Sequence, residues 1–261
     1  MPRRPAALPL PDPDRRRWFR QRLLAWYRQN GRTLPWRETS DPYHILVSEM
    51  MLQQTQVDRV LPKYHEWLAR YPSFAELSRA EEADVIRTWY PLGYNIRPRR
   101  LQAIARETME RFSGTLPDDE ETLLSFKGIG EYTVGAVRSF AFGKRAAILD
   151  TNVARVLFRI FVGKGDPASH RLKKHLWALS WTVLPRRHVF DFNQALMDFG
   201  ATACSARTPI CASRAPSSRS SARAAASGSD APVCPMAKHC RSYPITVPPA
   251  KRRRDPARSR S

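Results

Sequence analysis

The chain has 261 residues, 42% of them hydrophobic, and a formal net charge of +20. This length is sufficient for one large domain or two smaller ones with buried cores. The sequence contains no apolar run of roughly 18 residues, which excludes a hydrophobic membrane-spanning helix. Its N-terminus contains Arg but is interrupted by Pro and Asp, and it lacks the apolar core of a signal peptide. We therefore expect an unexported protein without a membrane partner.

Positive charge is concentrated at the two ends of the chain. Residues 1–37 carry ten Arg and two Asp, a net charge of +8, and residues 212–261 carry eleven Lys or Arg and two Asp, a net charge of +9. This leaves +3 for residues 38–211. Basic ends around a nearly neutral centre indicate a polyanionic partner, most simply nucleic acid. The final KRRR-containing tail is equally explained by genome composition or solubility. We expect a bacterial cytoplasmic protein associated with the nucleoid, or a nuclear one if the source is a eukaryote.

Apolar residues at helical spacing dominate the centre of the chain. Asp41 is a predicted N-cap, with Pro42 at the first position of the helix that follows. Prolines and short polar breaks separate further segments with an apolar period near 3.6 residues, at 78–89, 97–112, 118–126, 130–142, 152–162, 168–184 and 189–204. The run at 145–150 is strand-like but too short to establish a sheet. The sequence therefore predicts an all-α fold.

A Gly-x-Gly turn joins two of the predicted helices. Gly128 and Gly130 flank Ile129, and glycine permits the tight turn that a short connection between helices needs. Backbone N–H groups at the start of the second helix can then bind an anion such as a DNA phosphate. This predicts a helix-hairpin-helix that holds DNA without reading its sequence. The alternative is an ordinary turn between two helices.

Two carboxyl side chains are candidates for chemistry. Ile45, Glu49 and Leu52 share one helical face by their spacing. A carboxyl group on an apolar face has a raised pKa and can serve as a general acid near neutral pH, whereas a Glu at the edge of that face would be solvated. Asp150 precedes a predicted helix and, taken alone, is more simply explained as its N-cap.

All four cysteines lie in the last quarter of the chain. Cys204 and Cys211 are separated by six residues, Cys234 and Cys240 by five, and Cys211 and Cys234 by 22. Structural disulfides are rare in unexported proteins, which favours a metal site. The long gap contains a stretch rich in Ser, Ala and Arg, residues 213–232, which cannot bury a core and is predicted to be disordered.

Several motifs occur in the same order as in a known family. They are LPWRETSDPYHILVSEMMLQQTQV, FKGIGEYTVGAV, AILDTNVARV, FNQALMDFGATAC and the two pairs of cysteines. In these the chain resembles MutY-type adenine DNA glycosylases, which belong to the helix-hairpin-helix superfamily that includes endonuclease III. The resemblance covers residues 18–211 and resumes at residues 234–243.

The resemblance implies two all-α lobes with DNA across the cleft between them. Residues 42–149 would form a six-helix barrel containing the hairpin. Residues 18–41 and 150–243 would form a second lobe with an iron–sulfur cluster, flanked by a flexible basic N-terminus (1–17) and a basic tail (244–261). The partner would be double-stranded DNA containing a mismatch or an oxidised guanine, bound by a monomer. The target base would be flipped out, because its glycosidic bond cannot be reached inside a duplex.

The resemblance also implies catalytic roles. Glu49 would protonate N7 of the flipped adenine, and Asp150 would stabilise the positive charge that develops on the sugar as the bond to the base breaks. Asn152 would help to place the attacking water or Asp150. Tyr132 matches an active-site Tyr of the family, whereas relatives that also cut the strand have a Lys there. The resemblance therefore implies base removal without strand cleavage.

A further group of residues would contact DNA or the flipped base. Those next to the base would form its pocket and a wedge into the helix, and the carboxamide of Gln194 could both donate to and accept from adenine. The residues are Trp36, Arg37, Gln53, Gln54, Thr55, Tyr94, Lys127, Gly128, Ile129, Gly130 and Gln194.

The chain differs from the family in ways that bear on its substrate. The 261 residues end in a basic tail, so we expect a short form without the C-terminal domain by which the family senses 8-oxoguanine. The PLGYN segment has Pro91 and Asn95 where the family has Gly and Tyr. Both features resemble the short thymine–guanine mismatch glycosylases of the same superfamily. Removal of thymine or uracil opposite guanine is therefore the alternative to removal of adenine opposite guanine or 8-oxoguanine.

The insert between the second and third cysteines is another difference, since the family has two residues there. Closing the longer loop costs roughly 2 kcal/mol more, which is several-fold less than structural metal binding contributes. We therefore expect a [4Fe–4S] cluster held by Cys204, Cys211, Cys234 and Cys240. A Zn²⁺ site or an empty site is the alternative.

Overall fold

The computed structural model describes residues 8–166, 168–206, 212–213, 234–242 and 245–246, so Cys211 and nearly all of the low-complexity stretch lie outside the described residues. Apart from two short strands, the regular secondary structure of the described chain is helical, which confirms the predicted fold class. The α-helices are α1 (Pro13–Asn30), α2 (Pro42–Leu52), α3 (Val57–Arg70), α4 (Phe74–Arg79), α5 (Glu82–Trp89), α6 (Ile96–Phe112), α7 (Glu120–Ser125), α8 (Glu131–Phe140), α9 (Thr151–Leu157), α10 (His170–Val183) and α11 (Val189–Asp198). Short 3-10 turns occupy Pro35–Arg37 and Ala237–His239, and π turns extend α9 and α11 over Phe158–Val162 and Phe199–Ala203.

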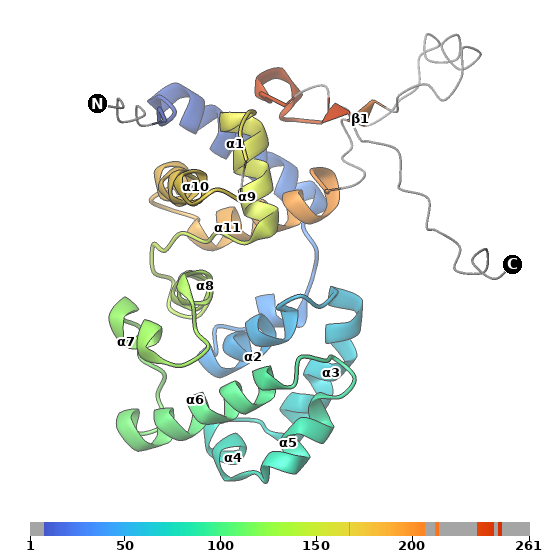
Figure 1. Ribbon diagram of the computed structural model, residues 1–261, viewed down its shortest axis with the longest axis vertical. Helices are drawn as coiled ribbons and strands as arrows, with labels where there is room; N and C mark the ends of the chain where they lie inside the picture. Colours follow the sequence, from blue (N-terminus) through green and yellow to red (C-terminus); the bar gives the residue numbers. More distant parts are fainter. Residues whose placement is uncertain (1–7, 167, 207–211, 214–233, 243–244, 247–261) are drawn as a thin grey trace, which may run out of the picture.

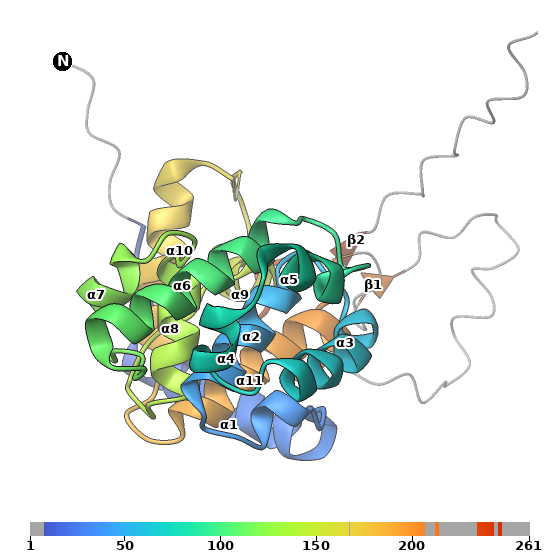
Figure 2. The ribbon, with the colours of Figure 1, turned by 90° about the horizontal axis from the view of Figure 1, so that it is seen from below.

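Two groups of helices stack along the long axis of the molecule (Figure 1). α1 lies with α9, α10 and α11 at one end, although α1 is far from them in sequence, and α2 to α7 occupy the other end. In Figure 2, seen from the lower end, α4 to α6 lie in front of the opposite group. α8 packs against α2, α7 and α11, so it connects the two groups.

α1 begins earlier than the sequence led us to expect. Its first residue is Pro13, five residues before the expected boundary at residue 18, because the Asp12 side chain accepts a hydrogen bond from the Arg15 N–H at 2.8 Å and Pro suits the first turn. Phe19 and Leu23 are completely buried in the interface with the C-terminal helices. The helix is therefore attached to the fold through its apolar face.

α2 is a central helix. It begins at Pro42 as predicted, and the Asp41 carboxylate caps it by accepting hydrogen bonds from the N–H groups of Tyr43 (2.7 Å) and His44 (3.2 Å). The helix is buried on nearly all sides, from Tyr43 to Met51, because α3, α6 and α8 pack around it. Any polar side chain in its middle is consequently shielded from water.

The strand-like run at 145–150 is an extended connection without a strand partner. It lies directly against α8, where a Cβ atom at Gly135 would come within 2.1 Å of the Ala147 carbonyl oxygen. The Ser180 hydroxyl of α10 donates to the Ile148 carbonyl at 2.7 Å. These contacts fix the path of the chain as it approaches Asp150, the residue before α9.

The described strands are β1 (Ala212–Ser213) and β2 (Ile245–Thr246), which pair in parallel. This pairing places residues 245–246, part of the expected basic tail, beside residues 212–213. No helix in the described ranges is both long and apolar enough to cross a membrane.

Candidate functional site

Glu49 lies in the middle of the buried helix α2 and is only 3% exposed. The alternative in which this side chain is solvated at the edge of a helix face is therefore wrong. Burial raises the pKa of Glu49 to about 7, with a further increase from the charge of Asp150, while a hydrogen bond with Tyr132 and the charge of Arg37 oppose it. Its Oε2 atom is buried and has no hydrogen-bond partner among the described residues.

Asp150 is the N-cap of α9. Its Oδ1 accepts a hydrogen bond from the Val153 N–H at 2.7 Å, and its Oδ2 accepts one from Asn152 Nδ2 at 3.0 Å. Arg155 in turn donates to Asn152 Oδ1 at 2.7 Å, which fixes the orientation of the amide. Burial raises the pKa of Asp150 above its ordinary value, and these hydrogen bonds and the charge of Arg155 offset only part of that increase. Asp150 therefore caps a helix and also interacts with the charge of Glu49.

Tyr132 lies in the first turn of α8, between the two groups of helices. Its hydroxyl is 3.8 Å from the sulfur of Met197 on α11. Burial, followed by the charges of Glu49 and Asp150, raises its pKa well above the ordinary value. The side chain is therefore a neutral phenol beside the two carboxyl groups, and it has no amine that could form a Schiff base.

Gln194 reaches the same region from α11. It is 2% exposed, and its Oε1 has no hydrogen-bond partner in the described part of the chain. Met197 follows it by three residues, so both side chains lie on neighbouring positions of one helix face, and Met197 contacts Tyr132. Trp36 is 5% exposed and packs edge-on against Tyr64, with ring centroids 5.3 Å apart.

Arg37 is held by an acid that sequence reasoning missed. Asp198, at the end of α11, is completely buried and accepts hydrogen bonds from both terminal nitrogens of Arg37 at 2.8 Å. Burial alone would raise the pKa of Asp198, but the hydrogen bonds and charges of Arg37 and Arg32 keep it below the ordinary value. The sequence did contain a signal for this role of Asp198. It is an acidic residue on an apolar helix, four residues after Gln194 and therefore on the same helix face.

The two carboxyl groups have different surroundings, which suits a division of roles. Glu49 is buried with one oxygen unpartnered, so it is readily protonated near neutral pH. Asp150 accepts two hydrogen bonds, which favour its charged form. A neutral acid beside an ionisable carboxylate can protonate a leaving group and stabilise the cation left behind.

The predicted wedge residues Gln53, Gln54 and Thr55 and the predicted DNA-contacting residue Tyr94 lie in two loops. Gln53 and Thr55 are half-buried after α2, and Gln54 between them is exposed. Tyr94, in the loop before α6, is 61% exposed. Both loops are bound by Arg97, a buried residue that sequence reasoning did not single out.

The Gly-x-Gly turn joins α7 to α8. Gly128 has a φ of 107°, and a Cβ atom there would lie 2.6 Å from the side chain of Arg100, so glycine is required. Ile129 is buried, Lys127 is exposed and Gly130 is the N-cap of α8 without a side-chain cap. The turn therefore presents the first N–H groups of α8 near its exposed end, as a helix-hairpin-helix requires.

Comparison with known proteins identifies the family. Residues 47–180 match the family described as HhH-GPD superfamily base excision DNA repair protein. The chain belongs to this superfamily. The matched range includes both carboxyl residues and the hairpin.

Several proteins with a named activity are similar to this chain. The chain is similar to the adenine DNA glycosylases of Homo sapiens (41% identity over 202 residues, 74% of this chain and 37% of the relative) and Mycobacterium tuberculosis (43% over 192 residues, 72% and 62%). It thus spans less than two thirds of the length of these relatives. The solved structure of a thermostable thymine-DNA glycosylase is similar at a TM-score of 0.75 and 31% identity, covering 88% of this chain and 97% of that one.

Two of the three described cysteines of this HhH-GPD chain contact the residues of α9 and of the π turn that follows it. Cys204 and Cys234 are buried and Cys240 is partly buried. Arg159 donates to the Cys204 sulfur at 3.4 Å, and Cys240 Sγ lies 3.5 Å from the Arg159 carbonyl oxygen. Thiolate donors suit an iron–sulfur cluster. Across the described ranges, however, no three His, Cys, Asp or Glu side chains converge as metal ligands.

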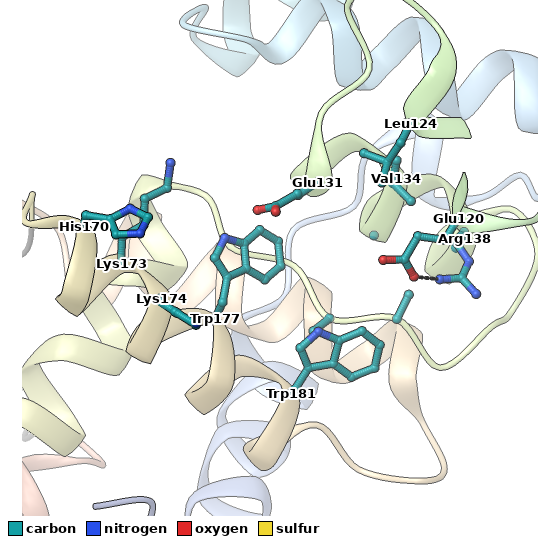
Figure 3. A pocket seen from close by; sticks show the side chains of 13 residues that line it. Glu120, Leu124, Glu131, Val134, Arg138, His170, Lys173, Lys174, Trp177 and Trp181 are labelled. Carbon is teal, nitrogen blue, oxygen red and sulfur yellow. Dashed lines mark hydrogen bonds and ion pairs between the residues drawn. The ribbon is translucent and has the colours of Figure 1, made fainter. Parts of the chain in front are cut away.

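A cavity of about 570 Å³ lies on another face of α8. Figure 3 shows Trp177 and Trp181 of α10 opposite Leu124 and Val134, with the Glu120–Arg138 ion pair to one side. Neither catalytic candidate of the HhH-GPD chain, Glu49 or Asp150, lines it. The cavity is therefore separate from the carboxyl pair.

Proposed function

We propose that this chain is a monofunctional DNA N-glycosylase that removes adenine mispaired with guanine or 8-oxoguanine in base excision repair. It acts as a monomer on double-stranded DNA and hydrolyses the N-glycosidic bond. The observation that carries the proposal is the buried Glu49 carboxyl, with a pKa near 7 and an unpartnered Oε2. The similarity to adenine DNA glycosylases supports the choice of base.

Glu49 is the general acid in this proposal. Its protonated carboxyl donates to N7 of a flipped adenine, which makes the neutral base a better leaving group. Gln194 has an unpartnered Oε1 that can accept a hydrogen bond from the adenine amino group. A bound adenine would therefore satisfy two buried polar atoms that otherwise lack partners, a state that costs free energy.

Asp150 stabilises the sugar cation. As the C1′–N9 bond breaks, positive charge develops on the sugar, and a carboxylate held in a fixed orientation by hydrogen bonds from Val153 and Asn152 stabilises it. Asn152 is positioned by Arg155 and orients Asp150. Water then adds to C1′, and the strand stays intact because Tyr132 offers no amine for a covalent imine intermediate.

DNA binding is assigned to the hairpin and the basic surface. The exposed Lys127 and the N-terminal end of α8 at Gly130 provide a phosphate contact. The net charge of +20 adds a sequence-independent attraction to DNA. Trp36 and Arg37 form a wall of the base pocket, and the loops carrying Gln54 and Tyr94 enter the duplex.

Removal of thymine or uracil opposite guanine is the second candidate. It is supported by the thymine-DNA glycosylase structure, 97% of which is covered by the match, and by Pro91 and Asn95 in the PLGYN segment. Gln194 favours adenine, because its carboxamide can both donate to and accept from the N6 and N7 edge.

A panel of mismatched duplexes tests the proposed function. The chain is incubated with A·G, A·8-oxoguanine, T·G and U·G duplexes, and abasic sites are then cleaved with alkali. We expect product from the two adenine duplexes only after alkali, and no trapping by borohydride. Excision from the T·G duplex alone would show that thymine, and not adenine, is the base that the chain removes. A nick without alkali that borohydride traps would contradict the monofunctional reaction.

A [4Fe–4S] cluster held by Cys204, Cys211, Cys234 and Cys240 is part of the proposal. When bound, it would cross-link the C-terminal part of the chain through four thiolate bonds. The burial of Cys204 and Cys234 and the guanidinium of Arg159 beside Cys204 support such a site. Iron analysis of the purified chain distinguishes the cluster from Zn²⁺ and from an empty site.

A further inference from the structure

Arg97, at the start of α6, binds the two loops that carry the exposed residues Gln54 and Tyr94. It is 3% exposed. Its Nη1 donates to the carbonyl oxygens of Met50 (3.0 Å), Met51 (2.9 Å) and Gln53 (2.5 Å) at the end of α2. Its Nη2 donates to Thr55 Oγ1 (3.2 Å). The Arg97 guanidinium thus contacts both neighbours of Gln54, the backbone of Gln53 and the side chain of Thr55.

The same guanidinium also contacts the loop before α6. Nη2 donates to the carbonyl oxygens of Leu92 (3.2 Å) and Gly93 (3.1 Å). The guanidinium carbon lies 5.4 Å from the centroid of the Tyr94 ring and 5.2 Å from that of Trp89, distances typical of cation–π contacts. Arg97 therefore connects the loop of Gln54 to the loop of Tyr94.

The residues between these contacts have unusual backbone conformations. Gln54 has a φ of 56° and Tyr94 a φ of 50°, both in the left-handed region that residues other than Gly seldom adopt. Such conformations persist where surrounding contacts enforce them, and they concentrate at functional positions. Both side chains are exposed, so the hydrogen bonds of Arg97 hold two outward-facing residues in conformations that the loops would seldom adopt alone.

The segment from the end of α5 to the first residue of α6 also exposes apolar surface. Tyr90 is 75% exposed, Tyr94 61% and Ile96 51%. Three large apolar side chains exposed within seven residues indicate a surface that contacts another molecule. In a DNA-binding protein, exposed aromatic rings stack on bases, and apolar side chains insert at base steps.

We propose that Arg97 is a positioning residue that holds Gln54 and Tyr94 as one rigid wedge, which enters the duplex at the step where the target base leaves the stack. This proposal rests on the proposed glycosylase function. A buried guanidinium is costly unless its N–H groups are bonded. The Nε of Arg97 has no hydrogen-bond partner in the described structure, but its Nη1 and Nη2 contact six acceptors, five of them main-chain carbonyls of the two loops and of the end of α2. Their combined geometry requires the planar fork of Arg, which Lys cannot replace.

A double-mutant cycle tests this role by affinity alone. Binding to a mismatched A·G duplex and to a matched A·T duplex is measured in the Glu49→Gln background, so that no base is removed. The measured quantity is the affinity for the A·G duplex divided by the affinity for the A·T duplex. We expect Tyr94→Ala and Arg97→Lys each to lower this ratio by about tenfold, the order of one lost base stack. Because both act on one wedge, the double variant should lower it little further.

Tyr90 provides the matched control. It is an exposed tyrosine of the same loop whose ring, unlike that of Tyr94, makes no cation–π contact with Arg97 within the described structure. The fold-changes that Tyr90→Ala and Arg97→Lys each cause in the affinity ratio should therefore multiply in the double variant. If Tyr94→Ala and Arg97→Lys also combine multiplicatively, the two residues are independent and the proposal is wrong. General destabilisation by Arg97→Lys would lower the unfolding midpoint without producing this selective non-additivity.

Thr55→Val keeps the test decisive if Arg97→Lys does not fold. The isosteric change removes the Thr55 hydroxyl that Arg97 contacts in the loop of Gln54. In the cycle with Tyr94→Ala it should show the same lack of additivity, with a smaller effect on the affinity ratio. Full additivity would again overturn the proposal. An absence of excision from every mismatched duplex by the unmodified chain would instead contradict the proposed function, and this outcome is independent of the cycle.

Discussion

Asp198 and Arg37 form a buried bidentate ion pair that joins α11 to the 3-10 turn after α1. Both terminal nitrogens of Arg37 lie 2.8 Å from the carboxylate oxygens, and the two side chains are 6% and 0% exposed. Arg32 donates to the same carboxylate from its backbone N–H at 2.9 Å and from Nε at 2.8 Å. The pair therefore holds Arg37 where its charge acts on Glu49.

Asp198→Asn should destabilise the fold strongly. The substitution leaves the Arg37 guanidinium buried without a countercharge, which costs about 3–5 kcal/mol in comparable pairs. Chemical denaturation measures the change in the free energy of unfolding. Arg32→Ala is the control, because Arg32 is 33% exposed and its loss leaves the Arg37 pair intact, so its cost should be much smaller. Equal costs for the two variants would contradict this account.

Glu49→Gln should abolish excision without impairing folding. The amide cannot protonate a base, and general acids contribute about 10²–10⁴-fold to rate. For the unmodified chain the excision rate should fall as pH rises through about 7, because Glu49 loses its proton there. Single-turnover excision at several pH values measures this. A rate that stays constant from pH 6 to about 8.5 would exclude Glu49 as the acid.

The same carboxyl should make stability depend on pH. Its folded-state pKa of about 7 exceeds the ordinary value of 4.5, so the folded protein binds more protons between these values and its stability falls as pH rises across them. Glu49→Gln removes this dependence. We expect the variant to be more stable than the unmodified chain above pH 7, by about 3 kcal/mol at most. If Glu49→Gln is less stable than the unmodified chain at pH 8, the folded protein stabilises the charged Glu49 carboxylate, which contradicts the prediction.

Gly135→Ala should disturb the approach to Asp150. The added methyl group would lie 2.1 Å from the Ala147 carbonyl oxygen, so the connection before Asp150 must move away from α8. We expect a loss of stability of about 1–3 kcal/mol together with slower excision. Gly130→Ala is the control for the fold, because a Cβ atom there meets nothing within 4 Å and its φ of −111° suits any residue. Thermal unfolding of both variants measures the difference.

Cysteine substitutions should reveal the cluster ligands. If Cys204, Cys211, Cys234 and Cys240 hold one [4Fe–4S] cluster, the purified protein absorbs near about 400 nm and each Cys→Ser variant loses iron. Ser205→Ala, next to the first cysteine, should retain the iron. Four thiols without iron in protein prepared anaerobically would exclude the cluster, and one tightly bound zinc would identify the alternative site.

The sequence by itself determined the fold class, several helix boundaries and the identities of the main candidates. Apolar spacing predicts helices because it records which face of each segment must be buried, and Asp41 followed by Pro42 marks a helix start through purely local hydrogen bonds. The turn at Gly128 is likewise local, since its φ of 107° favours glycine. The start of α1 at Pro13 lies within residues 1–17, which were expected to be flexible, although Asp12 and Pro13 form the same kind of local signal.

Only the tertiary structure decided how these residues act together. Spacing left open whether Glu49 is solvated or buried, because burial depends on α3, α6 and α8 packing around α2. Asp198 and Arg37 are 161 residues apart, and Arg97 is 44 residues from Gln53, so no periodicity within a segment could pair them. Ion pairs and guanidinium contacts of this kind arise when the chain folds, because the desolvation and geometry that make them strong exist only in the packed interior.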